Sequence, residues 1–520
     1  MATSIGNRSA SSEFGGGRLV LLLLLFALAI YQFVNAGFSA FAIVCILPVV
    51  AIGVILTFRY HLFIFWALMG INYFLQWHSL PLPSGIPMSM YNEMLELLLI
   101  ALAIIDVQRA RFDRCFNLML VALIMWSCFC TIEVLNDSCG LGIDGGAWYS
   151  GARMMAFQLL YAFLVFSIYI TDPKLLLRYL VVWACLSIFA AFWVWKQQHL
   201  GLTQMENAFL QGRGRTTHII NGGATIRLFS IFGDAANFGI NMAATAVTFL
   251  IAGLTMKIKK YRYFFLATGL ICLWGMMPSG TRTATFCVIA GIATYVVLSK
   301  SFKIAVPVAI LLGLAYFILA FTTIGNGNAQ VRRMRSGFNK DDASANQRTI
   351  NQAVMKKYLA DAPWGIGLGM GYENVPANNK FRKLATIPPD SEYVFIWIRT
   401  GYVGIVVFLI LTAVMLAGGC YIVMFRLQSP SLRGVGAGLC CAFVSIQLGG
   451  YANQVLMQFP NCLIFYGGLS LVYVLPHIEQ EWIDYEKKVF ADQEERKRLR
   501  LEKLDNMRIK PWYSWILRHL

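Results

Sequence analysis

The feature that most constrains this chain is a succession of apolar runs between residues 18 and 476. Each run is about 20 residues long, enough for a helix to cross the hydrocarbon layer of a membrane. A helix also satisfies the hydrogen bonds of its own backbone, which is necessary because the lipid interior offers no partners for them. We therefore predict an all-α, polytopic integral membrane protein. Its fourteen expected transmembrane helices are 18–35, 38–57, 60–77, 91–107, 115–135, 151–170, 176–196, 237–256, 262–278, 282–299, 304–322, 403–425, 434–455 and 459–476.

The links between these spans alternate in charge. Links on one side carry Lys or Arg, as in TFRYH, VQRARFDR, TDPKLLLR, KIKKYR, LSKSFK and FRLQSPSLRG, whereas opposite links such as HSLPLPSGIP and MPSGT carry none. Because basic residues collect in short cytoplasmic loops, the alternation predicts cytoplasmic N- and C-termini. Two longer segments then lie outside: residues 197–237, where we expect short interfacial helices, and residues 324–391, a large external loop.

Composition supports the membrane class. The chain is 58% hydrophobic and 13% charged, with a formal net charge of +17. In a membrane protein such a charge follows largely from cytoplasmic links, so we expect no nucleic-acid partner. The twelve cysteines lie mostly inside apolar runs without CxxC pairs, and we expect no metal site.

Polar ends flank the membrane region. Residues 1–17 are Gly/Ser-rich and predict a disordered cytoplasmic N-terminus; the run after them is interpreted as an uncleaved anchor, with a cleaved signal peptide as the alternative. Spans 1–11 occupy residues 18–323 and the last three occupy 392–476. Residues 477–520 predict a charged, solvated, helical cytoplasmic tail, whose Trp-rich end after Pro511 could instead lie on the inner membrane surface.

The 324–391 loop is the long hydrophilic insertion of the chain, and it is net basic. The rule that concentrates basic residues in cytoplasmic loops does not apply to long loops. An anionic ligand on the outer face would explain why this loop is basic. Ser344–Gln347 matches a capping box, which predicts a helix over residues 345–359 with Ile350, Val354 and Tyr358 on one stripe.

A Gly-rich run, PWGIGLGMG, spans residues 363–371. It superficially resembles a nucleotide-binding loop, but no strand precedes it. We predict instead that its glycines allow close packing against the membrane helices.

Ionisable residues lie near the outer ends of several spans. Glu93 and Glu96 are one helical turn apart, and Glu133 and Arg153 lie at similar depth. Such residues are costly in a membrane and are usually paired or functional. A Glu133–Arg153 ion pair that fastens helices and a functional role are both open on the sequence.

Three arginines are expected to converge at the outer surface. Arg227 precedes LFSIFGD, Arg282 lies in the turn SGTRTA, and Arg348 lies in the first turns of the loop helix. Converging guanidinium groups bind diphosphate oxygens through paired hydrogen bonds. The alternative for each one, and above all for Arg282, is snorkelling to lipid headgroups.

These motifs, together with D-S-E-Y-x-x-x-W-x-x-x-G-x-x-G from Asp390 to Gly404, resemble the O-antigen ligase and polymerase family. The resemblance covers about residues 200–425. It rests on short motifs that occur in the same order, and at the same expected membrane depth, as in that family. It implies a glycosyltransferase that uses no nucleotide, metal or other cofactor. The donor would be a glycan on a polyprenyl (undecaprenyl) diphosphate carrier. The location would be the bacterial cytoplasmic (inner) membrane, with the active site facing the periplasm or cell exterior.

The resemblance also implies roles for individual residues. Arg227 and Arg282 would bind the donor diphosphate, and Arg348 would support it from the loop. Neutralising the charge of the leaving diphosphate lets arginine replace a metal.

Direct inversion at the anomeric carbon still requires a base for the acceptor hydroxyl. Asp390 is the first candidate for the base or an acceptor-binding residue, followed by Glu392 and His218. Asp390 could also act as a helix N-cap, with or without a catalytic role.

The sequence departs from the ligase pattern at Asp390-Ser391, where ligases commonly carry His-Asn and polymerases often carry Asp. This favours a polymerase that joins carrier-linked repeat units into O-antigen, capsule or exopolysaccharide, beside other assembly and export proteins. The alternative is a ligase that transfers the glycan to lipid A core or another acceptor.

Other classes are less well supported. A transporter or flippase for lipid-linked oligosaccharide usually shows repeated halves and broken helices, which the sequence does not display. A glycosyltransferase with catalytic acids in its first external loop is disfavoured, because that link, near Ala36-Gly37, is almost absent. A non-enzymatic assembly component stays open.

Overall fold

The structure is a computed structural model of the chain. It describes residues 61–80, 88–107, 110–220, 225–325, 343–387 and 390–506, together with residues 27, 327, 331, 332 and 335. The expected N-terminal segment, nearly all of the first two spans and the residues around Pro511 lie outside the described residues. The candidate site lies wholly within residues 67–520, the larger of the two units into which the contacts divide the chain.

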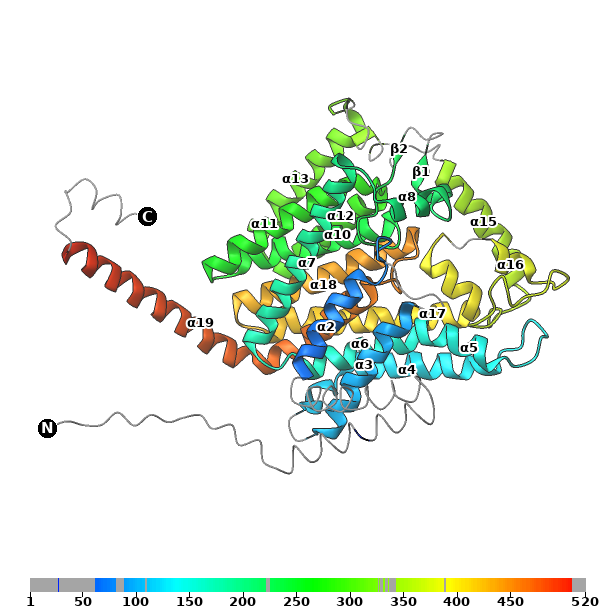
Figure 1. The fold of residues 1–520 in the computed structure, drawn as a ribbon, viewed down its shortest axis with the longest axis horizontal. Helices are drawn as coiled ribbons and strands as arrows, with labels where there is room; N and C mark the ends of the chain where they lie inside the picture. Colours follow the sequence, from blue (N-terminus) through cyan, green and yellow to red (C-terminus); the bar gives the residue numbers. More distant parts are fainter. Residues whose placement is uncertain are drawn as a thin grey trace. The chain divides into compact units, whose positions relative to one another are not determined.

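The described chain is helical apart from a two-residue antiparallel ladder, β1 (Ile219–Ile220) with β2 (Thr225–Ile226). The helices follow one another along the chain (Figure 1). They are α2 (His61–Phe74), α3 (Met88–Ile105), α4 (Leu118–Ile132), α5 (Gly145–Ala152), α6 (Gln158–Tyr169), α7 (Pro173–His199), α8 (Gln204–Gln211), α9 (Arg215–His218), α10 (Ala235–Thr255), α11 (Lys259–Gly275), α12 (Arg282–Ser299), α13 (Phe302–Phe321), α15 (Ala343–Leu359), α16 (Arg382–Thr386), α17 (Glu392–Tyr421), α18 (Pro430–Ala452) and α19 (Gly467–Asn506).

The all-α membrane class is confirmed at this level. Every expected span that falls on described residues coincides with a helix. Among the described residues, eight helical segments are long and apolar enough to cross a membrane. The count of fourteen spans and the orientation of the termini stay predictions. The eight segments are Leu118–Leu135, Gly145–Tyr169, Pro173–His199, Ala235–Thr255, Arg282–Ser299, Glu392–Arg426, Pro430–Ala452 and Cys462–Leu499.

The basic links that were expected on one side of the membrane contact one another. Arg114 Nη1 donates to the carbonyl of Thr171 at 2.8 Å. The backbone N–H of Lys257 donates to Ser431 Oγ at 3.1 Å. These contacts join links that are distant in sequence, as the alternation of charge predicts.

Helix α19 runs without interruption from the last span into the charged tail. The carboxylate of Glu479 accepts the backbone N–H groups of Gln428 and Ser429, both at 2.7 Å. Trp482 is fully buried, and Glu486 lies 3.8 Å from Lys257 Nζ. The prediction of a solvated tail is therefore wrong for the first turns of the tail, which bind to the basic links through Glu479 and Glu486.

The opposite links meet at the other end of the bundle. His78 Nε2 is hydrogen-bonded to the carbonyl of Gly233 at 3.1 Å, and Asn136 Nδ2 donates to the carbonyl of Trp364 at 2.7 Å. The second pair joins the link after α4 to the large loop. Short helices do form in the 197–237 segment, namely α8 and α9, as expected, while their place at the membrane interface stays a prediction.

The large loop carries its own apolar core, in which α15 and α16 pack beside the start of α17 (Figure 1). On α15, Met355 and Leu359 are buried, whereas Ile350 is 57% exposed. The helix therefore turns the face that contains Met355 and Arg348, seven residues apart, towards α17, while Ile350 of the predicted stripe faces outward and Tyr358 packs against the loop core. α15 begins at Ala343, two residues earlier than expected.

The Gly-rich run packs backbone against backbone. The N–H of Gly367 donates to the carbonyl of Arg399 at 3.0 Å, and the N–H of Tyr402 donates to that of Pro363 at 2.9 Å. α17 is broken at Gly401, where φ is 65° and ψ is −164°. A Cβ on Gly401 would lie 1.9 Å from the Pro363 carbonyl oxygen. The prediction that these glycines permit close approach is confirmed.

Candidate functional site

Arg227 is held beside the turn that leads to Arg282. Its Nη2 donates to Thr281 Oγ1 at 2.9 Å, and its Nε donates to the carbonyl of Ser279 at 3.2 Å. The backbone of the next residue, Leu228, donates to the carbonyl of Pro278 at 3.2 Å. The two arginines that the sequence placed together, 55 positions apart, therefore lie on adjoining backbone segments.

The N-terminus of α12, which begins at Arg282, differs from that of α10. Asp234 caps α10 by accepting the N–H groups of Ala236 and Asn237 at 2.7 and 2.9 Å. No such side-chain bond is made by Thr281 at the start of α12. An N-terminus carries partial positive charge and N–H donors, so this one suits an anion between Arg227 and Arg282.

His218 is also at this end, with 1% of its surface exposed. Its Nε2 accepts the N–H of Ala235 at 3.2 Å, so its Nδ1 carries the proton and donates to Gly214 O at 3.1 Å. Burial lowers the pKa of His218 to about 4. The ring is thus neutral near pH 7, but both nitrogens are engaged, and a role as base would require one of them to be released.

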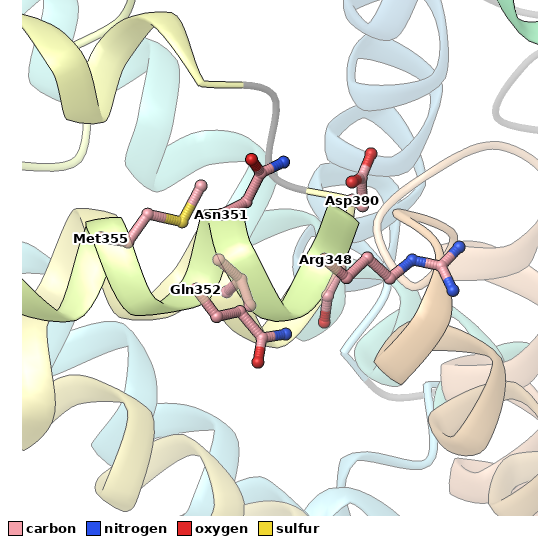
Figure 2. Close-up of a pocket in the computed structure, with 7 residues that line it drawn as sticks. Arg348, Asn351, Gln352, Met355 and Asp390 are labelled. Carbon is pink, nitrogen blue, oxygen red and sulfur yellow. The ribbon is translucent and has the colours of Figure 1, made fainter. Parts of the chain in front are cut away.

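Arg348 and Asp390 line one narrow pocket of about 10 Å³ between α15 and the start of α17. Figure 2 shows the Arg348 side chain extending from α15 past Asp390. Asp390 is exposed, while Arg348 Nε is buried and has no hydrogen-bond partner among the described residues. The other lining residues are Asn351, Gln352, Met355, Ser391 and Val394.

The helix-capping alternative for Asp390 is wrong. α17 begins at Glu392, so Ser391 occupies the N-cap position, and no side chain caps the helix there. Ser391 Oγ donates instead to the carbonyl of Gly450 at 3.2 Å. The Asp390 carboxylate is one residue outside the cap and is not used to hold the helix.

The end of α18 joins the two halves of the site. Gly450 accepts the hydroxyl of Ser391, beside Asp390, and Asn453 Nδ2 donates to Thr283 Oγ1 at 3.3 Å, beside Arg282. The starts of α12 and α17 therefore both contact the same helix end. Arg227 and Arg282 lie beside the contact at α12, and Arg348 and Asp390 lie beside the contact at α17.

Glu392 lies elsewhere. It is 3% exposed, and its Oε2 accepts the N–H of Leu456 at 3.0 Å. Its side chain lines a cavity of about 400 Å³ that shares no residue with the Arg348 pocket. The sequence did not reveal this cavity, because its walls come from scattered Gln, Ser, Met and Phe residues that form no motif. They are Gln76, Ser89, Ser150, Gly151, Met154, Met155, Glu392, Phe395, Gln454, Met457, Gln458 and Phe459.

The ionisable residues at the outer ends of the spans pair differently from the expected arrangement. Arg153 Nη1 lies 3.1 Å from Glu93 Oε2, and its Nη2 donates to Ser89 Oγ at 2.9 Å. Glu133 instead accepts Asn136 Nδ2 at 2.8 Å. The expected Glu133–Arg153 pair is therefore wrong, although a Glu–Arg pair does fasten two helices.

In the part of the chain that the structure describes, no group of three His, Cys, Asp or Glu side chains could hold a metal ion. The independence of the reaction from metals stays a prediction.

Fold and site together define a class: a multi-pass helical membrane protein with arginines and an exposed carboxylate gathered where a structured basic loop joins the bundle. Residues 264–409 match the family model described as O-Antigen ligase. The match covers the segment from α11 to the first part of α17, supports an O-antigen ligase-like family and confirms the resemblance drawn from the motifs. Arg282, Arg348, Asp390 and Glu392 lie within it, and Arg227 and His218 precede it. A search of curated proteins finds no match.

Proposed function

We propose that the protein polymerises polyprenyl-diphosphate-linked oligosaccharide repeat units by glycosyl transfer on the outer face of the cytoplasmic membrane. The observation that carries the proposal is the bond from Arg227 to Thr281, which sets Arg227 beside Arg282 and the uncapped start of α12. Two guanidinium groups and a helix N-terminus suit the two phosphates of such a donor.

In this proposal the diphosphate is the leaving group. Arg227 and Arg282 neutralise the charge that develops on it as its bond to the anomeric carbon breaks. Arg348, with its buried Nε, supports the diphosphate from α15. Arg348 is the only one of the three that comes from the loop, so the loop must be in place for the site to be complete.

The acceptor hydroxyl attacks the anomeric carbon from the opposite face, and the configuration is inverted. Its proton passes to a carboxylate, for which Asp390 is our first choice. Two observations support it: Asp390 is exposed and does not cap α17, and it lines a pocket with Arg348. Glu392 and then His218 follow.

The ligase alternative differs only in the acceptor. It is supported by the description of the matched family model, whereas Asp390-Ser391 in place of His-Asn supports a polymerase. A flippase is the alternative from another class. The break of α17 at Gly401 is of the kind seen in transporters, but here the loop backbone packs into the break.

The proposal is tested by replacing Arg227, Arg282 and Arg348 singly with Ala and with Lys, and measuring polymer length in cells and protein level in membranes. Lys356→Ala is the matched control, because Lys356 is an exposed cation on the same helix as Arg348. We expect Ala at either Arg227 or Arg282 to remove long polymer and Lys to restore little, since Lys lacks the paired donors. Normal polymer in both Ala variants would contradict the proposal.

A further inference from the structure

We propose that the cavity of about 400 Å³ beside Glu392 binds the acceptor sugar, separately from the diphosphate site. The inference rests on the proposed glycosyl transfer and assigns a second substrate site to it. The volume is that of a small-ligand pocket. The cavity is formed where α3, α5, the start of α17 and the segment after α18 meet.

The lining suits a sugar and does not suit a diphosphate. Among the described residues that line the cavity, none is Arg or Lys, and Glu392 is the charged one. Neutral amides and hydroxyls hydrogen-bond sugar hydroxyls, and apolar side chains cover the C–H faces of the rings. Both kinds are present: Gln76, Ser89, Ser150, Gln454 and Gln458 are polar, and Met154, Met155, Phe395, Met457 and Phe459 are apolar.

One polar atom in the wall lacks a partner. Gln458 Oε1 is buried and accepts no hydrogen bond within the described chain. A buried amide oxygen without a donor is unfavourable, and a ligand hydroxyl would supply one. Gln76 differs, because its Oε1 already accepts the N–H of Gly233 at 3.2 Å and Asn237 Nδ2 at 3.3 Å. Of these two amides, Gln458 is therefore the one whose oxygen would gain a hydrogen bond from a ligand.

The start of α17 is the wall between the two substrate sites. Asp390 lines the pocket of Arg348, and Glu392, two residues on, lines the cavity. Glu392 is held by the Leu456 N–H, from the same segment that carries Gln454 and Gln458. An acceptor bound in the cavity would thus contact the elements that position Asp390. Glu392 and Gln458 fix the acceptor sugar, and the arginines fix the donor.

The test uses the purified full chain in lipid nanodiscs, with two readouts. Binding is measured with polyprenyl diphosphate alone, and chain lengthening with the carrier-linked oligosaccharide isolated from cells that make the polymer. Ser150→Phe fills the cavity, and Gln458→Leu removes the unpartnered amide. Gln211→Leu, on the exposed end of α8, is the control.

We expect both cavity variants to bind polyprenyl diphosphate as the unaltered protein does. Their chain lengthening should fall about tenfold or more, as expected for the loss of one to two hydrogen bonds. For Gln458→Leu the loss should be mainly in KM for the acceptor. Gln211→Leu should change neither readout.

Unchanged lengthening in Gln458→Leu and Ser150→Phe would overturn the inference. So would loss of polyprenyl diphosphate binding in both, which would assign the cavity to the donor while leaving the proposed function in place. If the unaltered protein neither binds the diphosphate nor lengthens chains, the proposed function itself fails.

Discussion

Asp390 and Glu392 are two residues apart, yet they face different spaces: Asp390 lies beside Arg348 in a narrow pocket, and Glu392 is buried in the wall of a cavity of about 400 Å³. The start of α17 separates the two spaces. This arrangement allows two carboxylates in one short motif to serve two substrates. It also means that substitutions at the two positions should have different effects.

Asp390→Asn should abolish polymer formation with little effect on stability. The carboxylate is exposed and does not cap α17, so the fold does not depend on its charge. Polymer length in cells and thermal unfolding in detergent measure the two effects. Glu392→Gln is the comparison, and it should affect both, because Glu392 is buried and bonded to Leu456. Full activity in Asp390→Asn would exclude it as the base.

Gly401→Ala should destabilise the junction between loop and bundle. The residue has a φ of 65°, and a Cβ would lie 1.9 Å from the carbonyl oxygen of Pro363. Overpacking of this kind costs about 1–3 kcal/mol, and the left-handed backbone adds more. Thermal unfolding should show the loss. Gly145→Ala, where a Cβ meets nothing within 4 Å, is the control and should be nearly neutral.

Arg153→Ala should be strongly destabilising, by about 3–5 kcal/mol, because it leaves the buried carboxylate of Glu93 without its cation. The double variant Arg153→Ala with Glu93→Gln should recover part of the loss, since no uncompensated charge then remains. Unfolding in denaturing detergent compares the single and double variants. Equal stability of the two would show that the uncompensated charge of Glu93 is not the cause of the loss.

His218 should make the stability of the protein depend on pH. Burial lowers its pKa from 6.5 to about 4 in the folded state, so the unfolded chain binds more protons between these values. The stabilisation is therefore complete above about pH 6.5 and is lost as the pH falls towards 4, by on the order of 1–3 kcal/mol. His218→Asn should flatten this part of the curve of unfolding temperature against pH. His199→Gln, at the exposed end of α7, should not.

The sequence predicted the parts of the fold that depend on local patterns. Apolar runs located the helices. Alternating charge predicted that the basic links share one side, and contacts between such links are found from Arg114 to Thr171 and from Lys257 to Ser431. The short motifs around Arg227 and Arg282 predicted that the two residues lie close together, because each is in a turn at the same end of a span. The bond from Arg227 to Thr281 agrees with this prediction. The close packing of the Gly-rich run was also expected: a Cβ on Gly365 would lie 2.5 Å from the carbonyl oxygen of Arg399.

What the sequence missed depends on contacts between distant residues. Ile350 is as apolar as Met355, so pattern alone did not decide which face of α15 is buried; packing on α17 decides it. The partner of Arg153 is Glu93 and not Glu133, because α3 packs against α6. The cavity beside Glu392 arises from several segments and has no signature in any one of them.

The most direct test of the account is reconstitution of the purified chain with the carrier-linked oligosaccharide as the only substrate, followed by gel analysis of the carrier-linked products. We expect a ladder of lengthened glycans that remain on polyprenyl diphosphate, with release of free polyprenyl diphosphate, and no ladder with Arg227→Ala or Arg282→Ala. An unaltered protein that leaves the oligosaccharide unchanged, or an Arg282→Ala variant that makes the full ladder, would contradict it.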